Sequence, residues 1–488
     1  MYTLSSVSAG EYRRGLEAYK SSWRTWMLVL GLTLFYFHLY MNFPKIVHLI
    51  FVGIPLLFIA VYHVSDPRSW LLLLPVAITF GNRTYEFGSF YTAVATMAVL
   101  AAALLYFIVK IAGYRSFPRF PVPVYILLAA FLAQVASAFV SLHYHNSLVS
   151  NTLREASKLF IAASIIPLIY DWYGRGEWLV RILKTLTLML IVMSVFGIYQ
   201  YNAGNLDTSG EQASGYDLAG RVYSTIAGGP NSYSGVLELL VPTILAAMFR
   251  FRKKIWKITA FAAVLLGIQN VLYTFSRGGF LTVTLACFVF LVYRNRKKIW
   301  VPVTTLILFA VVLLANADEF KRQLTVFGDT RSLIMDTSLL HRYTSYKGFV
   351  NGIVNSPAVG VGWGSEEFFH GRTSLYSFWE VRHEDSINKI NRFGGLNSLI
   401  LEMPYKGGLF SALSLVLLIA AVVVTSIKLL RSGSDKSLGM GMISGVAAFG
   451  VHQAVDNLTQ WPQTGAFFWL VFGLLISVAY PCCGKEAD

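Results

Sequence analysis

The sequence predicts an all-α polytopic membrane protein, as its composition and the lengths of its apolar runs indicate. Of the 488 residues, 55% are hydrophobic and 13% are charged, and the mean hydropathy is +0.57. The apolar residues come in runs of about 18–25, which is the length that an α-helix needs to cross a bilayer. A soluble chain of this size does not have this composition, and three cysteines exclude a disulfide framework.

The apolar runs predict about fourteen membrane spans. Residues 1–24 are polar and basic and lack a cleavage site behind a short apolar core, so the first span is expected to stay as an anchor. The third run is short and contains Pro75. The runs lie near 25–42, 46–63, 69–82, 89–112, 121–142, 155–172, 178–200, 233–250, 258–275, 279–293, 299–316, 397–428, 437–457 and 464–480.

The positions of the cations predict which side of the membrane each connection faces. If the N-terminus is cytoplasmic, every strongly basic short connection falls inside, as helical membrane proteins favour, and so do both termini. The net charge of +15 therefore needs no nucleic-acid partner. The expected organisation is a cytoplasmic segment 1–24, spans 1–11 within 25–316, a large periplasmic loop 317–396, spans 12–14 within 397–480 and a cytoplasmic tail 481–488.

Two long connections, 201–232 and 317–396, fall on the opposite side, where we expect the functional site. The second one mixes charged residues with aromatics such as Phe368 and Trp379, so it is expected to fold as a cap. The turn at Arg277 faces the same side. These connections therefore carry the polar residues that need a functional explanation.

Three arginines on this side suit an anionic ligand. Arg277 stands at the edge of a membrane hairpin, where a guanidinium costs roughly 2–4 kcal/mol at depth and less near the interface. Gly278 and Gly279 follow it, and glycines let a backbone turn tightly and approach a bound group. Arg221 lies just before the eighth span, and Arg342 lies in the large loop 317–396. The alternative for Arg221 and Arg277 is an interfacial anchor, and for Arg342 it is a salt bridge to an acid of its own loop.

Four motifs, taken together, resemble the O-antigen ligase and O-antigen polymerase superfamily of bacterial membrane glycosyltransferases. They are Ser276-Arg277-Gly278-Gly279-Phe280-Leu281 at a hairpin turn, Arg221 upstream of Gly229-Pro230-Asn231, Arg342 upstream of Pro357-x-x-Gly360-x-Gly362, and Leu396-Asn397-Ser398-Leu399-Ile400-Leu401-Glu402 followed by Gly407. The resemblance covers roughly residues 180–430. Ligases of the family usually have a histidine where this chain has Leu396, and Pro404 stands where a glycine is common. The missing histidine weakens a ligase interpretation more than a polymerase one.

The resemblance implies transfer of a glycan from a polyprenyl (undecaprenyl) diphosphate-linked donor to an acceptor hydroxyl, at the periplasmic face of the bacterial inner membrane. The leaving diphosphate gains negative charge as its bond to the sugar breaks, and arginines can donate paired hydrogen bonds to it. No Asp-x-Asp motif occurs on the outer side, so neither a metal ion nor another cofactor is expected. The expected partners are the lipid-linked donor, a glycan or lipid acceptor, the bilayer and further proteins of O-antigen or exopolysaccharide assembly.

The candidate residues follow from the motifs and their chemistry. The catalytic candidates are Arg221, Arg277, Arg342, Asn397 and His383, and the substrate-binding candidates are Asn231, Ser276, Gly278, Gly279, His341 and Glu402. Asn397 has the alternative role of an N-cap, and the identity of a general base is open. The rival function is a lipid-linked oligosaccharide flippase or transporter. Sparse charges within the spans and the lack of a repeat between the two halves favour the enzyme.

Overall fold

The structure is a computed structural model of the chain, and it describes residues 72, 74–80, 84–87, 90–112, 119–145, 149–173, 176–204, 221–226, 228–295, 303, 346, 349–363, 398–432 and 435–481. These residues are helical apart from turns, connections and one antiparallel hairpin, β1 (Thr84–Phe87) paired with β2 (Phe90–Ala93). The prediction of an all-α protein is therefore confirmed for the described part, with the hairpin as a short exception. The spans expected near 25–42 and 46–63 lie outside the described residues, as do the segment 1–24, the tail after residue 481 and, apart from residue 303, the span near 299–316.

Seven of the described helices are long and apolar enough to cross a membrane, so a multi-pass membrane protein is confirmed. They are α5 (Val122–His145), α8 (Gly176–Ala203), α10 (Gly229–Arg250), α11 (Lys254–Tyr273), α12 (Arg277–Arg294), α19 (Leu399–Ser432) and α21 (Pro462–Ala479). Three further helices also coincide with predicted runs, namely α3 (Leu74–Phe80), α4 (Val94–Ala112) and α20 (Lys436–His452). The total of fourteen spans stays a prediction.

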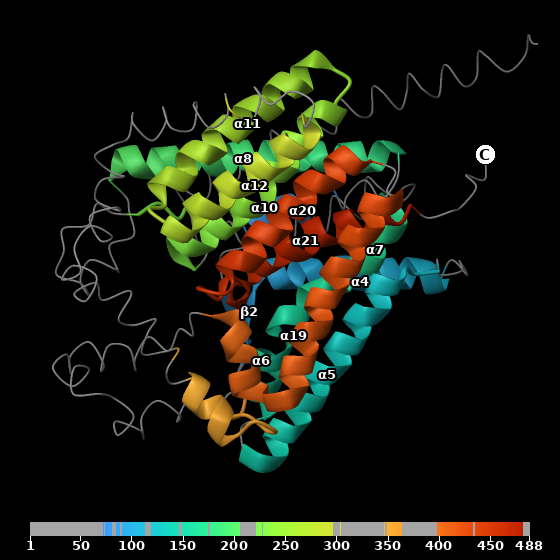
Figure 1. Cartoon of the computed structure of the whole chain (residues 1–488), viewed down its shortest axis with the longest axis vertical. Helices are drawn as coiled ribbons and strands as arrows, with labels where there is room; N and C mark the ends of the chain where they lie inside the picture. Colours follow the sequence, from blue (N-terminus) through green and yellow to red (C-terminus); the bar gives the residue numbers. More distant parts are fainter. Residues whose placement is uncertain are drawn as a thin grey trace, which may run out of the picture. The chain divides into compact units, whose positions relative to one another are not determined.

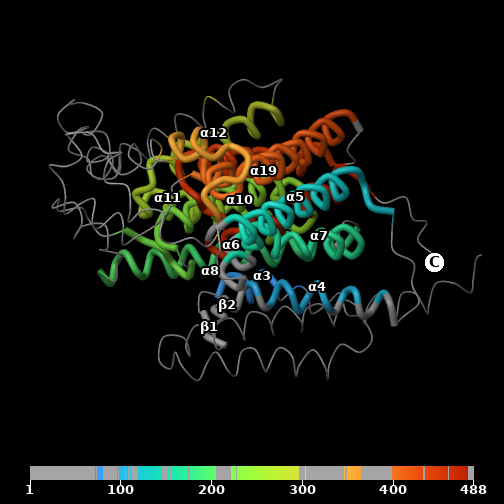
Figure 2. Tube along the Cα trace, turned by 90° about the horizontal axis from the view of Figure 1, so that it is seen from below, coloured from blue at the N-terminus to red at the C-terminus, as the bar shows by residue number. Residues whose placement is uncertain are grey.

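Contacts divide the chain into two units, Met1–Val76 and Ala77–Asp488. In the first unit only Leu72 and the beginning of α3 are described, so the fold given below is that of the second unit. Within it, α10 packs against α8, α11, α12, α20 and α21, and α19 packs along α5. Figures 1 and 2 show both arrangements from two directions.

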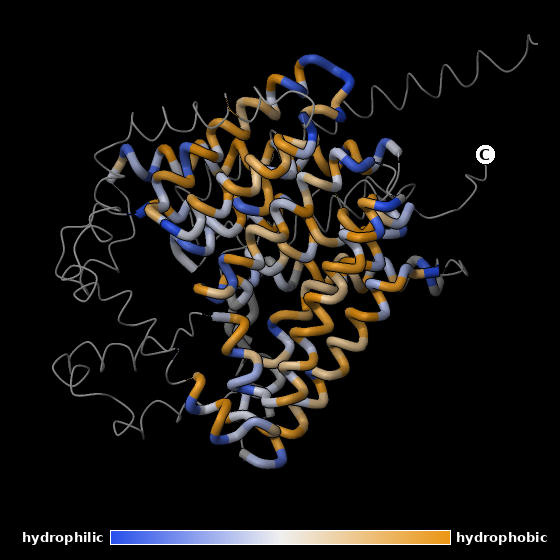
Figure 3. The backbone as a smooth tube through the Cα atoms, viewed as in Figure 1, coloured by the Kyte–Doolittle hydropathy of each residue, from blue (hydrophilic) through white to orange (hydrophobic). Residues whose placement is uncertain are grey.

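The helices α10 and α21 form the core of this unit. In the most apolar 18-residue stretch of each helix, 83% is buried in α10 and 94% is buried in α21, because other helices surround them. The peripheral helices instead expose apolar side chains at helical spacing, as α19 does at Leu409, Leu413, Val416 and Ile419. Figure 3 shows hydrophobic residues along the length of α19 and α5 and hydrophilic ones at the connection between α10 and α11. Faces of this kind favour contact with lipid.

The apolar run predicted near 155–172 is not one regular helix. It consists of α6 (Val149–Ile161), a 3-10 turn, the short α7 (Ile166–Leu168) and a π-helical stretch at Ile169–Tyr173. Pro167 lies within it and has no N–H for a helical hydrogen bond, so the helix is interrupted there. Asp171 in the π-helical stretch forms an ion pair with Lys110 of α4, with the Nζ and Oδ2 atoms 2.6 Å apart.

The described parts of the connections that the sequence assigns to one side of the membrane lie at one end of the bundle. The N–H of Val222, before α10, donates to the carbonyl of Tyr273 at the end of α11, at 3.0 Å. The beginning of α19 is hydrogen-bonded to the segment that follows α20 at the same end. At the other end, Arg250 forms an ion pair with Asp435. This grouping agrees with the predicted alternation of successive connections between the two sides. Which end faces the cytoplasm stays a prediction.

Candidate functional site

The candidate site centres on the turn between α11 and α12. Phe275 has a φ of 49°, in the left-handed region, and it reverses the chain. Ser276 then caps α12, because its Oγ accepts a hydrogen bond from the N–H of Gly279 at 3.3 Å. Arg277 is half-buried in the first turn of this helix. Its position at the positive end of the helix dipole favours a negatively charged partner nearby.

The two glycines after Arg277 serve the packing of helices. Both are helical and neither has a positive φ, so the expectation that they make the turn is wrong. A Cβ atom on Gly279 would lie 1.5 Å from the Oγ of Ser234 on α10, and one on Gly278 would lie 3.0 Å from the Nε2 of His452 on α20. Their small size therefore lets α12 approach both neighbours closely. Their contact with a substrate stays a prediction.

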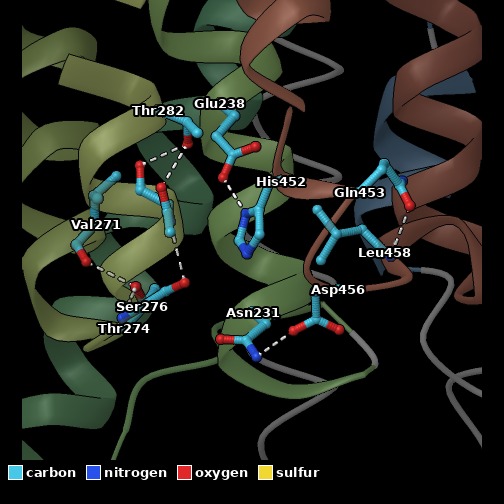
Figure 4. A network of polar contacts seen from close by, with 12 residues as sticks. Asn231, Glu238, Val271, Thr274, Ser276, Thr282, His452, Gln453, Asp456 and Leu458 are labelled. Atoms are coloured by element: carbon cyan, nitrogen blue, oxygen red, sulfur yellow. Dashed lines mark hydrogen bonds and ion pairs between the residues drawn. The ribbon is translucent and has the colours of Figure 1, made fainter. Parts of the chain in front are cut away.

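Arg221 lies against the turn that carries Arg277. Its Nε donates to the carbonyl of Thr274 at 2.8 Å, and its Nη2 donates to the Oδ1 of Asn231 at 2.7 Å. Asn231 in turn donates from Nδ2 to Asp456 at 2.6 Å, as Figure 4 shows. A chain of polar contacts thus joins the segment before α10, the α11–α12 turn and the segment after α20. It also gives Arg221 a structural role, beside which its catalytic role stays a prediction.

Glu402 joins α19 to the same end of the bundle. It is buried in the first turns of α19, where its Oε1 forms an ion pair with the Nζ of Lys406 at 2.6 Å. Its Oε2 accepts a hydrogen bond from Asn457, the residue after Asp456. The charge of this carboxylate is therefore balanced within the protein. Its role in substrate binding stays a prediction.

A break in α19 explains the glycines of the motif Pro357-x-x-Gly360-x-Gly362. Gly408 interrupts the helix with φ 57° and ψ −145°. The N–H groups of Val361 and Gly362 donate to backbone carbonyls just before the break, both at 2.9 Å. Gly360 and Gly362 have positive φ values, of 75° and 102°. Both glycines therefore form a turn that packs against the broken helix.

The residue after this turn fixes the described part of the large loop to α5. The indole Nε1 of Trp363 donates to the Oγ of Ser137 at 2.9 Å, and its backbone N–H donates to the Oγ of Ser141 at 2.6 Å, both on α5. On the other side of the described stretch, the Oη of Tyr346 donates to the carbonyl of Ala454 at 3.1 Å. The described part of the loop is therefore packed against the bundle. A cap over the site stays a prediction.

The sequence interpretation missed a buried pair of ionisable residues. Glu238 of α10 and His452 of α20 point toward each other, with Oε1 and Nδ1 2.5 Å apart (Figure 4). Both are ionisable residues within predicted apolar runs, Glu238 in 233–250 and His452 in 437–457. Such residues are functional candidates by default in a membrane protein, so the sequence could have identified each of the two residues, although not their contact.

The structure brings together one group of the predicted site residues, whereas another group lies outside the described residues. Together at the α11–α12 end are Arg221, Asn231, Ser276, Arg277, Gly278, Gly279 and Glu402. Outside the described residues lie Arg342, Asn397, His383 and His341. Among the described side chains, no group of three or more His, Cys, Asp or Glu is placed to hold a metal ion. Metal independence stays a prediction.

The fold and the site define a helical multi-pass membrane protein with a network of polar side chains at one end of its bundle. Residues 262–389 match the family model of O-antigen ligase. The match begins within α11 and includes Arg277 and the turn before Trp363. It confirms the resemblance predicted from the motifs and supports membership of the chain in the O-antigen ligase and polymerase superfamily. No curated protein matches the chain.

Proposed function

We propose that the protein is a glycosyltransferase of the O-antigen polymerase or ligase type. It transfers a glycan from a polyprenyl diphosphate-linked donor to an acceptor hydroxyl at the periplasmic face of the inner membrane. The observation that carries this proposal is the contact of Arg221 with Thr274 in the turn of Arg277, within the segment that matches the family. Arg221 therefore lies beside the turn that precedes Arg277, at the same end of the bundle.

The two arginines would bind the diphosphate of the donor. Arg277 stands at the beginning of α12, where the helix dipole favours an anion. The guanidinium of Arg221 is held in a fixed orientation by Thr274 and Asn231, so little ordering is needed when the donor binds. Arg342 is the third arginine of the proposed set.

Charge develops on the diphosphate during transfer. The acceptor oxygen attacks the anomeric carbon, the bond from that carbon to the diphosphate oxygen breaks, and its electron pair leaves with the polyprenyl diphosphate. Guanidinium groups stabilise this charge more strongly in the transition state than in the bound donor. The proton of the hydroxyl passes to a base, for which His383 is the candidate, and Asn397 would orient the acceptor.

The direct test supplies the purified protein in vesicles with a polyprenyl diphosphate-linked oligosaccharide. Release of polyprenyl diphosphate together with longer lipid-linked glycans would identify a polymerase. Release that depends on an added lipid A-type acceptor would identify a ligase. Movement of the donor across the bilayer without release of polyprenyl diphosphate would contradict the proposal and indicate a flippase.

A further inference from the structure

The buried pair Glu238–His452 has no part in the proposed transfer step. Its side chains are 0% and 2% exposed, in the interior of a bundle whose outer surface is apolar. An acid and an imidazole in such a place are costly unless they compensate each other, and the 2.5 Å contact between Oε1 and Nδ1 does so.

The contact with Glu238 fixes the orientation of the histidine ring. One ring nitrogen, Nδ1, is directed at the carboxylate, so the opposite edge of the ring is directed away from it. That edge lies against α12: a Cβ atom on Gly278 would be 3.0 Å from Nε2 and 3.1 Å from Cδ2. The imidazole therefore packs on the backbone of the residue that directly follows Arg277.

His452 also supports Arg221, through the backbone of His452. The carbonyl of His452 accepts hydrogen bonds from the N–H groups of Val455 and Asp456, at 3.0 and 2.9 Å. Asp456 accepts from Asn231, which in turn accepts from Arg221. The ring of His452 thus packs against Gly278, the residue after Arg277. Its backbone holds Asp456, which accepts a hydrogen bond from Asn231, the partner of Arg221.

We propose that Glu238 and His452 form a positioning pair for the two arginines, an inference that rests on the proposed function of Arg277 and Arg221. Glu238 holds the ring, the ring sets the distance of α12 from α20, and that distance places Arg277 relative to Arg221. The pair acts by the shape of the ring and by the contact between Oε1 of Glu238 and Nδ1 of His452. Neither residue contacts the substrate, as their burial indicates.

The first test compares a disruptive substitution with a conservative one. His452→Ala removes the ring and should lower kcat by about a hundredfold, because misplacing a catalytic group by about 1 Å has an effect of this size. The KM for the donor should change much less. Glu238→Gln keeps the size and an acceptor for the ring N–H, so its loss should be at most about tenfold. Equal losses in Glu238→Gln and His452→Ala would show that the pair acts by charge and would overturn the proposal.

The second test approaches the contact from α12. Gly278→Ala leaves the buried pair intact and inserts a methyl group against the ring, so kcat should fall by about tenfold or more. In the His452→Ala background the same substitution should cause no further loss, because the ring is gone. The matched control is Gly450→Ala on α20, where a Cβ atom would meet nothing within 4 Å. Additive losses from Gly278→Ala and His452→Ala would contradict the contact.

A third measurement does not depend on transferase activity. Arg277→Cys, in a chain with Cys482 and Cys483 replaced by serine, reports the position of the turn through its rate of reaction with a small charged methanethiosulfonate. His452→Ala should change this rate several-fold, and Gly450→Ala should not. An unchanged rate would overturn the positioning role even if the wild-type protein transfers glycan. A changed rate in a protein that transfers nothing would uphold the positioning role and contradict the proposed function.

Discussion

At the scale of the residue, the two arginines of the candidate site that the structure describes differ in how the protein holds them. Arg221 donates to Thr274 and Asn231 and thereby ties three segments together. Arg277 stands at a helix N-terminus, where a positive side chain gains nothing from the helix dipole. The sequence could predict both arginines and the turn, because the motifs are local. It could not predict the pair of Glu238 and His452, which are 214 residues apart and meet only in the folded bundle.

The two hydrogen bonds of Arg221 predict that a substitution there lowers the stability of the protein. Arg221→Lys keeps the charge but loses the geometry of two hydrogen bonds, so the free energy of unfolding should fall by about 1–3 kcal/mol. Thermal unfolding of the purified protein in detergent measures this, with the exposed Arg252→Lys as the control. An unchanged unfolding midpoint in Arg221→Lys would show that the contacts with Thr274 and Asn231 add no stability.

At the scale of the element, the sequence predicted where the helices lie better than where they break. The described apolar runs are helical apart from β2 at the beginning of the run 89–112, because length and composition favour helices in a membrane. The break of α19 at Gly408 depends on a turn at 357–363 that packs against it from a distant part of the chain. Gly407 and Gly408 could have indicated a break in the helix, although glycines are also frequent in unbroken membrane helices.

The break should be sensitive to a single methyl group. In Gly408→Ala the added Cβ would lie 2.4 Å from the carbonyl oxygen of Ala358, on a backbone with φ of 57°. We expect a loss of about 1–3 kcal/mol in the free energy of unfolding, because both the clash and the backbone strain are unfavourable. Unfolding in detergent is again the measurement, and Gly450→Ala, in open space, is the control. Equal unfolding midpoints for the two variants would contradict this explanation of the break.

At the scale of the whole molecule, the apolar runs and the positions of the cations together predict that the connections alternate between the two ends of the bundle. The basic connections lie at the end marked by Arg250 and Asp435, and the candidate site lies at the other end. The positive-inside rule assigns the first end to the cytoplasm. The network that joins α10, α12, α19 and α20 was not predictable, since it consists of contacts between side chains far apart in the sequence.

Labelling can test the predicted orientation directly. Asn202 and Arg252 are both exposed, at the site end and at the basic end respectively. In a chain with Cys482 and Cys483 replaced by serine, where the remaining Cys287 is buried, each position is changed to cysteine in turn. A maleimide that does not cross membranes should label Asn202→Cys in cells with a permeabilised outer membrane, and Arg252→Cys only after lysis. The reverse pattern would invert the topology and place the arginines in the cytoplasm.

The central claim is that Arg277 binds the leaving diphosphate as a planar, paired hydrogen-bond donor. Arg277→Lys keeps the charge but cannot donate paired hydrogen bonds. Losing such a bond in the transition state costs about 2–4 kcal/mol, or roughly a hundredfold or more in rate. Measured as glycan product per unit of membrane-inserted protein, transfer should fall by that factor in Arg277→Lys and stay unchanged in Arg252→Lys. Turnover close to the wild-type rate in Arg277→Lys would contradict the claim and leave Arg277 as an anchor at the membrane interface.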